Sequence, residues 1–442
     1  MSASGTENRT TLRIGTDAMK LTTIPNEFKE AAPVIREINA QGFEAYFVGG
    51  SVRDALLNKP IHDVDIATSA YPEEIKQIFK RTVDVGIEHG TVLVLMEDQQ
   101  YEVTTFRTES TYQDFRRPDE VTFVRSLKED LKRRDFTINA LALDSTGEII
   151  DLFDGIEDLT NQTIRAVGNP HERFHEDALR MMRGLRFASQ LDFKIEEKTL
   201  AAIAEFHPLL EKISVERITI EFVKMLLGVN RQGGLAPFIE TECYQYCPKL
   251  REQGAGLFRL MDLPARQIET EVEAWTLLIQ SLNLPEAEIR SFLKAWKLSN
   301  QLIQNVSQLV RGLRFRLNND WQPMMLYELG EESAVLVERL LYYYQQESQV
   351  QVTKELVKAL PIHQRHELAI TGKDLLAVLE ETPGKWLGEL IAEIEQHVVE
   401  GSLENKQEVL LSFAKNNVQK ERKHNANRNV YKRIFGERIT NG

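Results

Sequence analysis

The sequence has few cysteines and no long hydrophobic run, and both absences narrow its class. Two cysteines among 442 residues argue against a disulfide framework or a cysteine-based metal site, so Cys243 and Cys247 are expected to be reduced thiols. No apolar stretch approaches the roughly 20 residues that span a bilayer. The N-terminus also lacks the charged and apolar segments of a signal peptide. We therefore predict a cytoplasmic protein that contacts no membrane and needs no obligate protein partner.

Positive charge is also scarce, because the formal net charge is −13. A sequence-independent binder of long duplexes normally carries a positive total, so that class is disfavoured. A nucleic-acid substrate is still permitted, since local basic patches can coexist with an acidic total. Such patches occur at 132–134, at 173–186 and at 420–423.

Strand and helix patterns divide the chain unevenly. β-favouring and helical runs alternate up to about residue 160, whereas strand signals nearly vanish beyond about residue 170. The pattern predicts an α+β fold, in which a mixed sheet with helices is followed by an all-helical remainder. The predicted segments are a disordered extension (1–18), a mixed head (19–160), a helical neck (161–228), a helical body (229–320) and a helical tail with a basic C-terminus (321–442).

Within the head, local patterns predict individual elements. Ser51 is the expected N-cap of a helix that runs to residue 57. Further helices are predicted over 25–41 and 71–81, strands over 45–48, 64–68, 90–96 and 101–106, and a hairpin over 141–152.

A pair of acids, Asp63 and Asp65, is the first candidate catalytic feature. Alternate residues of a strand point to one face, so the two carboxylates would repel each other unless a cation lay between them. Mg²⁺ prefers such oxygen ligands and leaves room for substrate phosphates. A metal site of this kind supports in-line phosphoryl transfer. Glu102, in a neighbouring predicted strand, is the candidate third acid.

A glycine turn precedes this acidic pair. Gly49 and Gly50 stand before a predicted helix, where backbone N–H groups can approach phosphates closely. Arg53 adds a charge-assisted partner for the same phosphates. An isolated Asp-x-Asp pair is weak, and a glycine pair is often an ordinary turn, but together they indicate a nucleoside triphosphate site.

These motifs and four others resemble the class II tRNA nucleotidyltransferases, the CCA-adding enzymes of the polymerase-β-like superfamily, and the bacterial Bacillus type in particular. The resemblance covers roughly residues 45–225, with all the motifs in the family's order. The matching segments are 49–57 with 63–65, the ribose-contacting motif 133–140, the hinge motif 151–158, the base-selecting motif 176–180 and the neck-helix motif 214–217.

The resemblance implies a polymerase-β-like nucleotidyltransferase head and addition of C, C and A to the tRNA acceptor end from CTP and ATP, with Mg²⁺ as cofactor. It places the magnesium ligands on Asp63 and Asp65. It places the nucleotide contacts on Gly50, Arg53, Arg134, Asp177, Arg180, Arg183 and Arg186.

The base-selecting motif has a chemical rationale. We predict one helix over 174–189, on which Asp177 and Arg180 share a face. A carboxylate accepts hydrogen bonds and a guanidinium donates them, which matches the amino group and ring nitrogen of cytosine or adenine. Uracil and guanine present the reverse polarity. The alternative is a simple intrahelical salt bridge, which the nearby arginines disfavour.

Other predicted roles are less specific. Asp135 and Asn139 are four residues apart and can contact a ribose hydroxyl, although Asp135 can instead cap the next helix. The polar segment 110–120 resembles the family's flexible loop, in which Asp114 or Arg116 would act when the pocket changes from C to A. The alternative is a plain hairpin connection.

Three rival functions remain open at this point: a bacterial poly(A) polymerase, an enzyme that adds only the terminal A, and a catalytically silent tRNA-binding module. The acidic set Asp63, Asp65 and Glu102 disfavours the last of these.

Overall fold

The computed structural model describes residues 12–14, 19–86, 89–96, 99–109, 112–113, 117–118, 121–380 and 382–418. The chain forms two compact units, residues 1–274 with 278–299 and residues 275–277 with 300–442. No helix in the described ranges combines the length and hydrophobicity of a membrane span. The loop residues Asp114 and Arg116 and the basic end beyond residue 418 lie outside the described residues.

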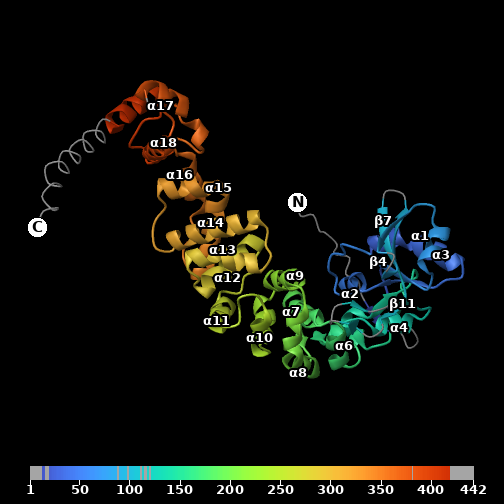
Figure 1. Ribbon diagram of the computed structural model, residues 1–442. Helices are drawn as coiled ribbons and strands as arrows, with labels where there is room; N and C mark the ends of the chain where they lie inside the picture. Colours follow the sequence, from blue (N-terminus) through green and yellow to red (C-terminus); the bar gives the residue numbers. More distant parts are fainter. Residues whose placement is uncertain are drawn as a thin grey trace, which may run out of the picture. The chain divides into compact units, whose positions relative to one another are not determined.

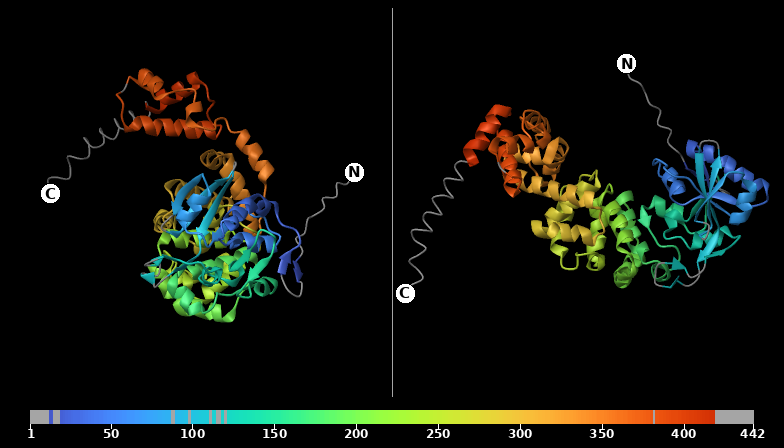
Figure 2. Two further views of the ribbon diagram at one scale, coloured as in Figure 1. Left: turned by 90° about the vertical axis from the view of Figure 1, so that its right-hand side faces the viewer. Right: turned by 45° about the horizontal axis from the view of Figure 1, so that its top comes forward.

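A seven-stranded mixed sheet forms the centre of the first unit, in the order β13-β12-β3-β4-β7-β6-β5. Strands β4 and β7 are parallel, whereas the other neighbours pair antiparallel. The strands fan out in the right-hand view of Figure 2, as the usual twist of a sheet requires. The strands are β3 Ala45–Val48, β4 Asp65–Thr68, β5 Thr82–Gly86, β6 Thr91–Met96, β7 Gln99–Thr105, β12 Leu141–Leu143 and β13 Ile149–Asp151.

Each face of this sheet is covered differently (Figure 1). On one face Phe47, Ile66 and Val103 pack with helix α1 (Asn26–Ala40) in the main core. On the other face Val48 and Ala67 pack with helix α4 (Leu127–Lys132) in a smaller cluster. The smaller cluster leaves part of the second face open, and the candidate site lies there.

Helices follow the head in the first unit, and α7 packs against both α9 and α10. Besides α1 and α4, the helices of the first unit are α2 Gly50–Leu56, α3 Pro72–Ile78, α5 Gly155–Thr160, α6 Pro170–Glu176, α7 Leu179–Leu191, α8 Glu197–Phe206, α9 Val215–Leu226, α10 Arg231–Glu240, α11 Gly254–Asp262, α12 Glu271–Leu282 and α13 Glu286–Ala295. Short strand pairs complete the unit: β1 Leu12–Ile14 with β2 Met19–Leu21, β8 Arg107–Glu109 with β11 Val121–Phe123, β9 Tyr112–Gln113 with β10 Arg117–Pro118, and β14 Thr163–Ile164 with β15 Lys194–Ile195.

The second unit is helical throughout its described part and has its own apolar core, which includes Leu326, Ile362 and Ile394. Buried Glu338 accepts hydrogen bonds from the side chains of Arg316 and Trp321. Its helices are α14 Asn300–Arg316, α15 Pro323–Leu340, α16 Val350–Lys358, α17 Gly372–Leu379 and α18 Lys385–Val399.

The α+β fold class is confirmed, and so are most of the predicted head elements, but the predicted cap of α2 and the predicted helix over 174–189 are wrong. Ser51 does not cap helix α2, because Gly49 is the N-cap and the Ser51 hydroxyl donates to the Val48 carbonyl at 3.0 Å. The predicted single helix over 174–189 is broken: α6 ends at Glu176 and α7 begins at Leu179. The sequence analysis also missed the edge strand β5.

A close approach between the end of α9 and helix α7 depends on Gly228. A Cβ atom there would lie 2.7 Å from the carbonyl carbon of Ser189 and 2.8 Å from its oxygen, both backbone atoms. We expect Gly228→Ala to lower the free energy of unfolding of the first unit by about 1–3 kcal/mol, as overpacking does. Chemical denaturation measures the change.

Gly86→Ala is the matched control, because the new methyl group would meet only the Thr91 Cβ at an ordinary 3.8 Å. Equal stabilities of Gly228→Ala and the wild type would contradict the close packing of α7 and α9.

Candidate active site

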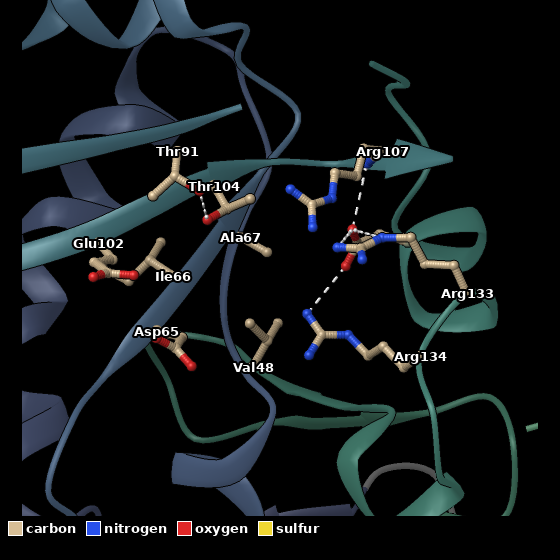
Figure 3. Close-up of a pocket in the computed structure, with 11 residues that line it drawn as sticks. Val48, Asp65, Ile66, Ala67, Thr91, Glu102, Thr104, Arg107, Arg133 and Arg134 are labelled. Carbon is tan, nitrogen blue, oxygen red and sulfur yellow. Dashed lines mark hydrogen bonds and ion pairs between the residues drawn. The ribbon is translucent and has the colours of Figure 1, made fainter. Parts of the chain in front are cut away.

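The candidate site begins with a row of residues across three strands of the sheet. Asp65 on β4 pairs in register with Glu102 on the parallel strand β7 and with Val48 on the antiparallel strand β3. Paired residues on adjacent strands project to the same face. The structure therefore brings Asp65 and Glu102 side by side (Figure 3). Asp63 precedes β4, which begins at Asp65, so the prediction that both aspartates belong to the strand is wrong for Asp63.

Desolvation and the neighbouring acids both affect the pKa of Asp65. Burial raises the pKa of Asp65 above its ordinary value, the charges of Glu102 and Asp63 raise it further, and Arg134 opposes the rise. Ionised carboxylates that share a site repel each other unless a cation neutralises them. No three His, Cys, Asp or Glu side chains in the described ranges form a ready-made metal cluster. An open pair of carboxylates still suits a hard cation that takes its remaining ligands from water and phosphate.

A pocket of about 210 Å³ lies over this part of the sheet. Asp65 and Glu102 line one side, and the guanidinium groups of Arg107, Arg133 and Arg134 line the other (Figure 3). The pocket therefore has one acidic wall and one basic wall, separated by the small side chains of the sheet.

Gly49 allows the two walls to approach each other. Its φ of +71° lies in the left-handed region, which favours glycine. A Cβ atom at this position would stand 3.0 Å from Nη1 of Arg134 and 4.0 Å from Oδ2 of Asp65. Since helix α2 begins at the next residue, Gly50, its first N–H groups and the Arg134 guanidinium form a site that suits phosphates.

A buried carboxylate, Asp130 on α4, holds the basic wall in place. Its Oδ1 accepts hydrogen bonds from Nε and Nη2 of Arg133 at 3.0 and 2.9 Å, and its Oδ2 accepts from Nη2 of Arg134 at 3.1 Å. Burial alone would raise the pKa of Asp130, but Arg133 and Arg134 outweigh burial and lower it. The sequence analysis missed Asp130, although its spacing of three and four residues from the two arginines is a recognisable signal.

A chain of polar contacts joins the head to helix α7. Nη1 of Arg53 donates to Oδ1 of Asn139 at 2.7 Å, and Nδ2 of Asn139 donates to Oδ1 of Asp135 at 3.1 Å. Oδ2 of Asp135 accepts from Nε of Arg183 at 2.7 Å. Burial would raise the pKa of Asp135, but Arg183 and the hydrogen bond from Asn139 hold it well below its ordinary value. Asp135 is not the cap of the following helix, whose N-cap is Phe136.

The side chains of three predicted arginines lie close to one aromatic ring on α7. The guanidinium carbons of Arg53, Arg183 and Arg186 lie 5.2, 5.6 and 4.1 Å from the centre of the Phe187 ring. The negative face of a ring attracts such cations. Burial lowers the pKa of Arg186 to about 10, although Glu221 on α9, 2.8 Å away, acts in the opposite direction. Arg186 therefore stays charged at neutral pH.

Asp177 lies at the break between α6 and α7. Its Oδ1 accepts a hydrogen bond from the backbone N–H of Leu179 at 3.0 Å, which satisfies an otherwise unpaired donor at the start of α7. Its Oδ2 accepts from Nη2 of Arg217 on α9 at 2.7 Å. Arg217 belongs to the predicted neck-helix motif, but its contact with Asp177 was not anticipated.

Arg180 is held by a different set of groups. Its Nη1 pairs with Oε2 of Glu176 at 2.5 Å, and its Nη2 donates to the Arg133 carbonyl at 2.8 Å. Asp177 and Arg180 thus have separate anchors, one on α9 and the other on α6 and the head.

Three protein-family models match the chain. The model described as "Poly A polymerase head domain" matches residues 45–165, and "Probable RNA and SrmB- binding site of polymerase A" matches residues 192–253. A model for domain 2 of tRNA nucleotidyltransferases matches residues 266–414.

Full-length relatives decide among the alternatives. A CCA-adding enzyme from Enterococcus faecalis is 98% identical over 397 residues, which cover 90% of this chain and 98% of that protein. One from Ligilactobacillus salivarius is 50% identical over 400 residues, which cover 90% of this chain and 98% of that protein. The chain belongs to the family of CCA-adding enzymes.

Structural similarity agrees with this assignment. The crystal structure of the Bacillus stearothermophilus CCA-adding enzyme in complex with CTP matches with a TM-score of 0.84 and 39% identity, covering 91% of this chain and all of that chain. The predicted resemblance and the predicted nucleotidyltransferase class are confirmed. These similarities therefore exclude the rival function of a catalytically silent tRNA-binding module.

Asp130 gives a direct test of the basic wall. We expect Asp130→Asn to lower the free energy of unfolding of the first unit by about 3 kcal/mol, because two guanidiniums lose their buried carboxylate. The substitution should also weaken CTP binding, since Arg134 is no longer held beside Gly49. Denaturation and calorimetric CTP titration measure the two effects.

Glu338→Gln in the second unit is the matched control. Glu338 is fully buried and pairs with Arg316 at 2.9 Å, so its loss should be comparably destabilising for that unit. CTP binding should remain at the wild-type level. Unchanged CTP affinity in folded Asp130→Asn would show that the basic wall does not serve the nucleotide.

Proposed function

We propose that this enzyme adds C, C and A to the 3′ end of tRNA from CTP and ATP, releases pyrophosphate, and selects the base with protein side chains. The observation that carries the proposal is the register of β4 and β7, which sets Asp65 beside Glu102 and opposite Arg134. An acidic wall and a basic wall that face each other suit transfer of a nucleotide from a triphosphate to a hydroxyl group.

The divalent cation of this reaction is proposed to be Mg²⁺, with Asp63 and Asp65 as its ligands and Glu102 as the third acid of the site. When bound, the ion would activate the attacking hydroxyl and neutralise charge on the reacting phosphate and the leaving pyrophosphate. Burial and the neighbouring charges of Glu102 and Asp63 raise the pKa of Asp65, and a bound cation would offset the repulsion among these acids, which supports this role.

The triphosphate of the incoming nucleotide is assigned to Gly50, Arg53 and Arg134, where α2 begins beside the basic wall. Arg183 and Arg186 add positive charge around Phe187. Asp135 and Asn139, joined by a hydrogen bond at 3.1 Å, are assigned to the ribose.

Base choice is assigned to Asp177 and Arg180. An ionised carboxylate offers about four lone-pair positions, so Asp177 can accept the amino group of cytosine or adenine while it keeps Arg217. The carbonyl of uracil or guanine would instead meet the negative Asp177. Two neighbouring acceptors without a proton between them are costly in a desolvated site.

Removing the charge of Asp65 or of Glu102 is predicted to reduce catalysis and to leave folding intact. We expect Asp65→Asn and Glu102→Gln each to reduce the rate of nucleotide incorporation about a hundredfold or more, because several kcal/mol of charge stabilisation disappear. The assay uses a tRNA transcript that ends at the discriminator base, with CTP and ATP, and resolves product length.

The control for the carboxylate row is Asp84→Asn, on strand β5 of the same sheet, where the side chain pairs with Lys76 at 3.0 Å. It should keep the wild-type rate. If the wild-type enzyme incorporated only A, and did so on RNA ends other than those of tRNA, CCA addition itself would be refuted.

The base-choice proposal predicts a change in selectivity for Asp177→Asn. The amide can donate as well as accept, so it no longer penalises a carbonyl group. We expect the ratio of kcat/KM for CTP over UTP to fall about tenfold or more. Single-nucleotide incorporation measures this ratio.

Asp192→Asn, at the other end of α7, is the matched control for selectivity. Asp192 accepts from Asn230 and lies outside the proposed base site, so the ratio should stay unchanged. An unaltered ratio in Asp177→Asn would remove Asp177 from base choice.

A further inference from the structure

Two threonines, Thr91 and Thr104, form a hydroxyl pair in the pocket beside the carboxylates. Thr104 on β7 pairs in register with Thr91 on β6 and with Ala67 on β4. The two side-chain oxygens lie 3.0 Å apart, and both residues line the pocket (Figure 3). No step of the proposed reaction uses either hydroxyl so far.

Strand geometry places this threonine pair on the same face of the sheet as the acids. Thr104 stands two residues after Glu102 on β7, so their side chains project to one face. The rise of a strand puts the two residues roughly 7 Å apart along β7. Asp65 and Ala67 repeat this spacing on the neighbouring strand β4. The threonine pair therefore forms a second row, next to the row of Asp65 and Glu102.

The chemistry of the threonine pair favours one kind of ligand group. Each hydroxyl has one proton to donate and two lone pairs that accept, and the bond between the two hydroxyls uses one proton. The pair can therefore both donate to a ligand and accept from it. A phosphate oxygen can only accept, whereas a ligand hydroxyl matches both capacities.

The direction of attack determines which hydroxyl can reach this row. In-line displacement requires the attacking oxygen to lie opposite the leaving pyrophosphate. The triphosphate is assigned to the start of α2 at Gly50, directly after β3 and Gly49. The strand order β3-β4-β7-β6 places Glu102, and then Thr91, on the other side of Asp65. The RNA end that supplies the attacking hydroxyl therefore lies over β7 and β6.

We propose that the threonine pair binds the 2′-hydroxyl of the terminal ribose of the RNA, and so selects ribonucleotide ends over deoxyribonucleotide ends. The inference rests on the proposed function, because it takes Asp65 and Glu102 as the reaction centre. The 3′-hydroxyl at the carboxylates and the 2′-hydroxyl beside it belong to one ribose, as the two adjacent rows require. The 2′-hydroxyl is also the group by which a protein can distinguish RNA from DNA at a given position.

Thr104→Val tests this contact, because valine keeps the branched shape and removes the hydroxyl. The substrates are two tRNAs that end at the discriminator base, with ribose or 2′-deoxyribose in that last nucleotide. We expect the wild type to add the first C to the ribose end with a kcat/KM about tenfold higher, the effect of one hydrogen bond. In Thr104→Val this ratio should fall to about one. A merely structural role would lower both values together and leave the ratio unchanged.

Two further variants define the cause. Thr104→Ser restores a hydroxyl and should restore the ratio. Thr82→Val is the matched control, since Thr82 lies on strand β5 of the same sheet but outside the set of residues that line the pocket. The ratio in Thr82→Val should equal that of the wild type.

The incoming nucleotide is the competing source of a 2′-hydroxyl, and CTP and 2′-deoxy-CTP are therefore compared in the same enzymes. Thr104→Val should leave this second ratio unchanged. A wild-type ratio of about one for the two RNA ends, or an effect of Thr104→Val on the nucleotide ratio alone, would overturn the proposal. The products that the wild type makes on the all-ribose tRNA test CCA addition separately, because they depend on no comparison of sugars.

Discussion

The parallel pairing of β4 with β7 is the constraint on which the rest of the site depends. It sets Asp65 beside Glu102 and creates a repulsion that Arg134 offsets only in part. Parallel neighbours are the minority in this otherwise antiparallel sheet. The fold therefore has its unusual strand pairing at the place where its chemistry requires two like charges together.

The positive charges of the site are held by buried acids. Asp130 holds Arg133 and Arg134, Asp135 holds Arg183, and Glu221 holds Arg186. Each of these acids is almost fully buried, so none competes openly with phosphate for the guanidiniums. This division explains how a chain with a net charge of −13 can maintain a locally basic site for anionic substrates.

The sequence predicted the fold class and the main chemical groups because their signals are local. Alternating β-formers around Glu102 were enough to place it on a strand, and the observed register sets it next to Asp65. The break at Asp177 was missed because α6 and α7 have one continuous helical pattern. An aspartate two residues before Leu179 is a capping signal that the sequence analysis did not use.

Contacts between distant segments could not be predicted in the same way. Nothing in the local pattern around Arg107 connects it with Asp130, and nothing around Phe187 connects it with Arg53. These contacts depend on tertiary packing, of β8 against α4 and of α2 against α7. The assigned roles of the site residues and the division into head, neck, body and tail remain predictions that the structure makes easier to test.

The interruption between α6 and α7 has a consequence for how one protein surface can serve two bases of different size. At Asp177 the backbone leaves the helical region, with φ of −142° and ψ of 104°. Asp177 belongs to neither helix, but its N–H still donates to the Arg173 carbonyl and its carboxylate is held by Arg217. A pyrimidine and a purine present their amino groups at different distances from the ribose. If Asp177 selects the base as proposed, its place between two helices lets its side chain adjust to either distance without unwinding a helix.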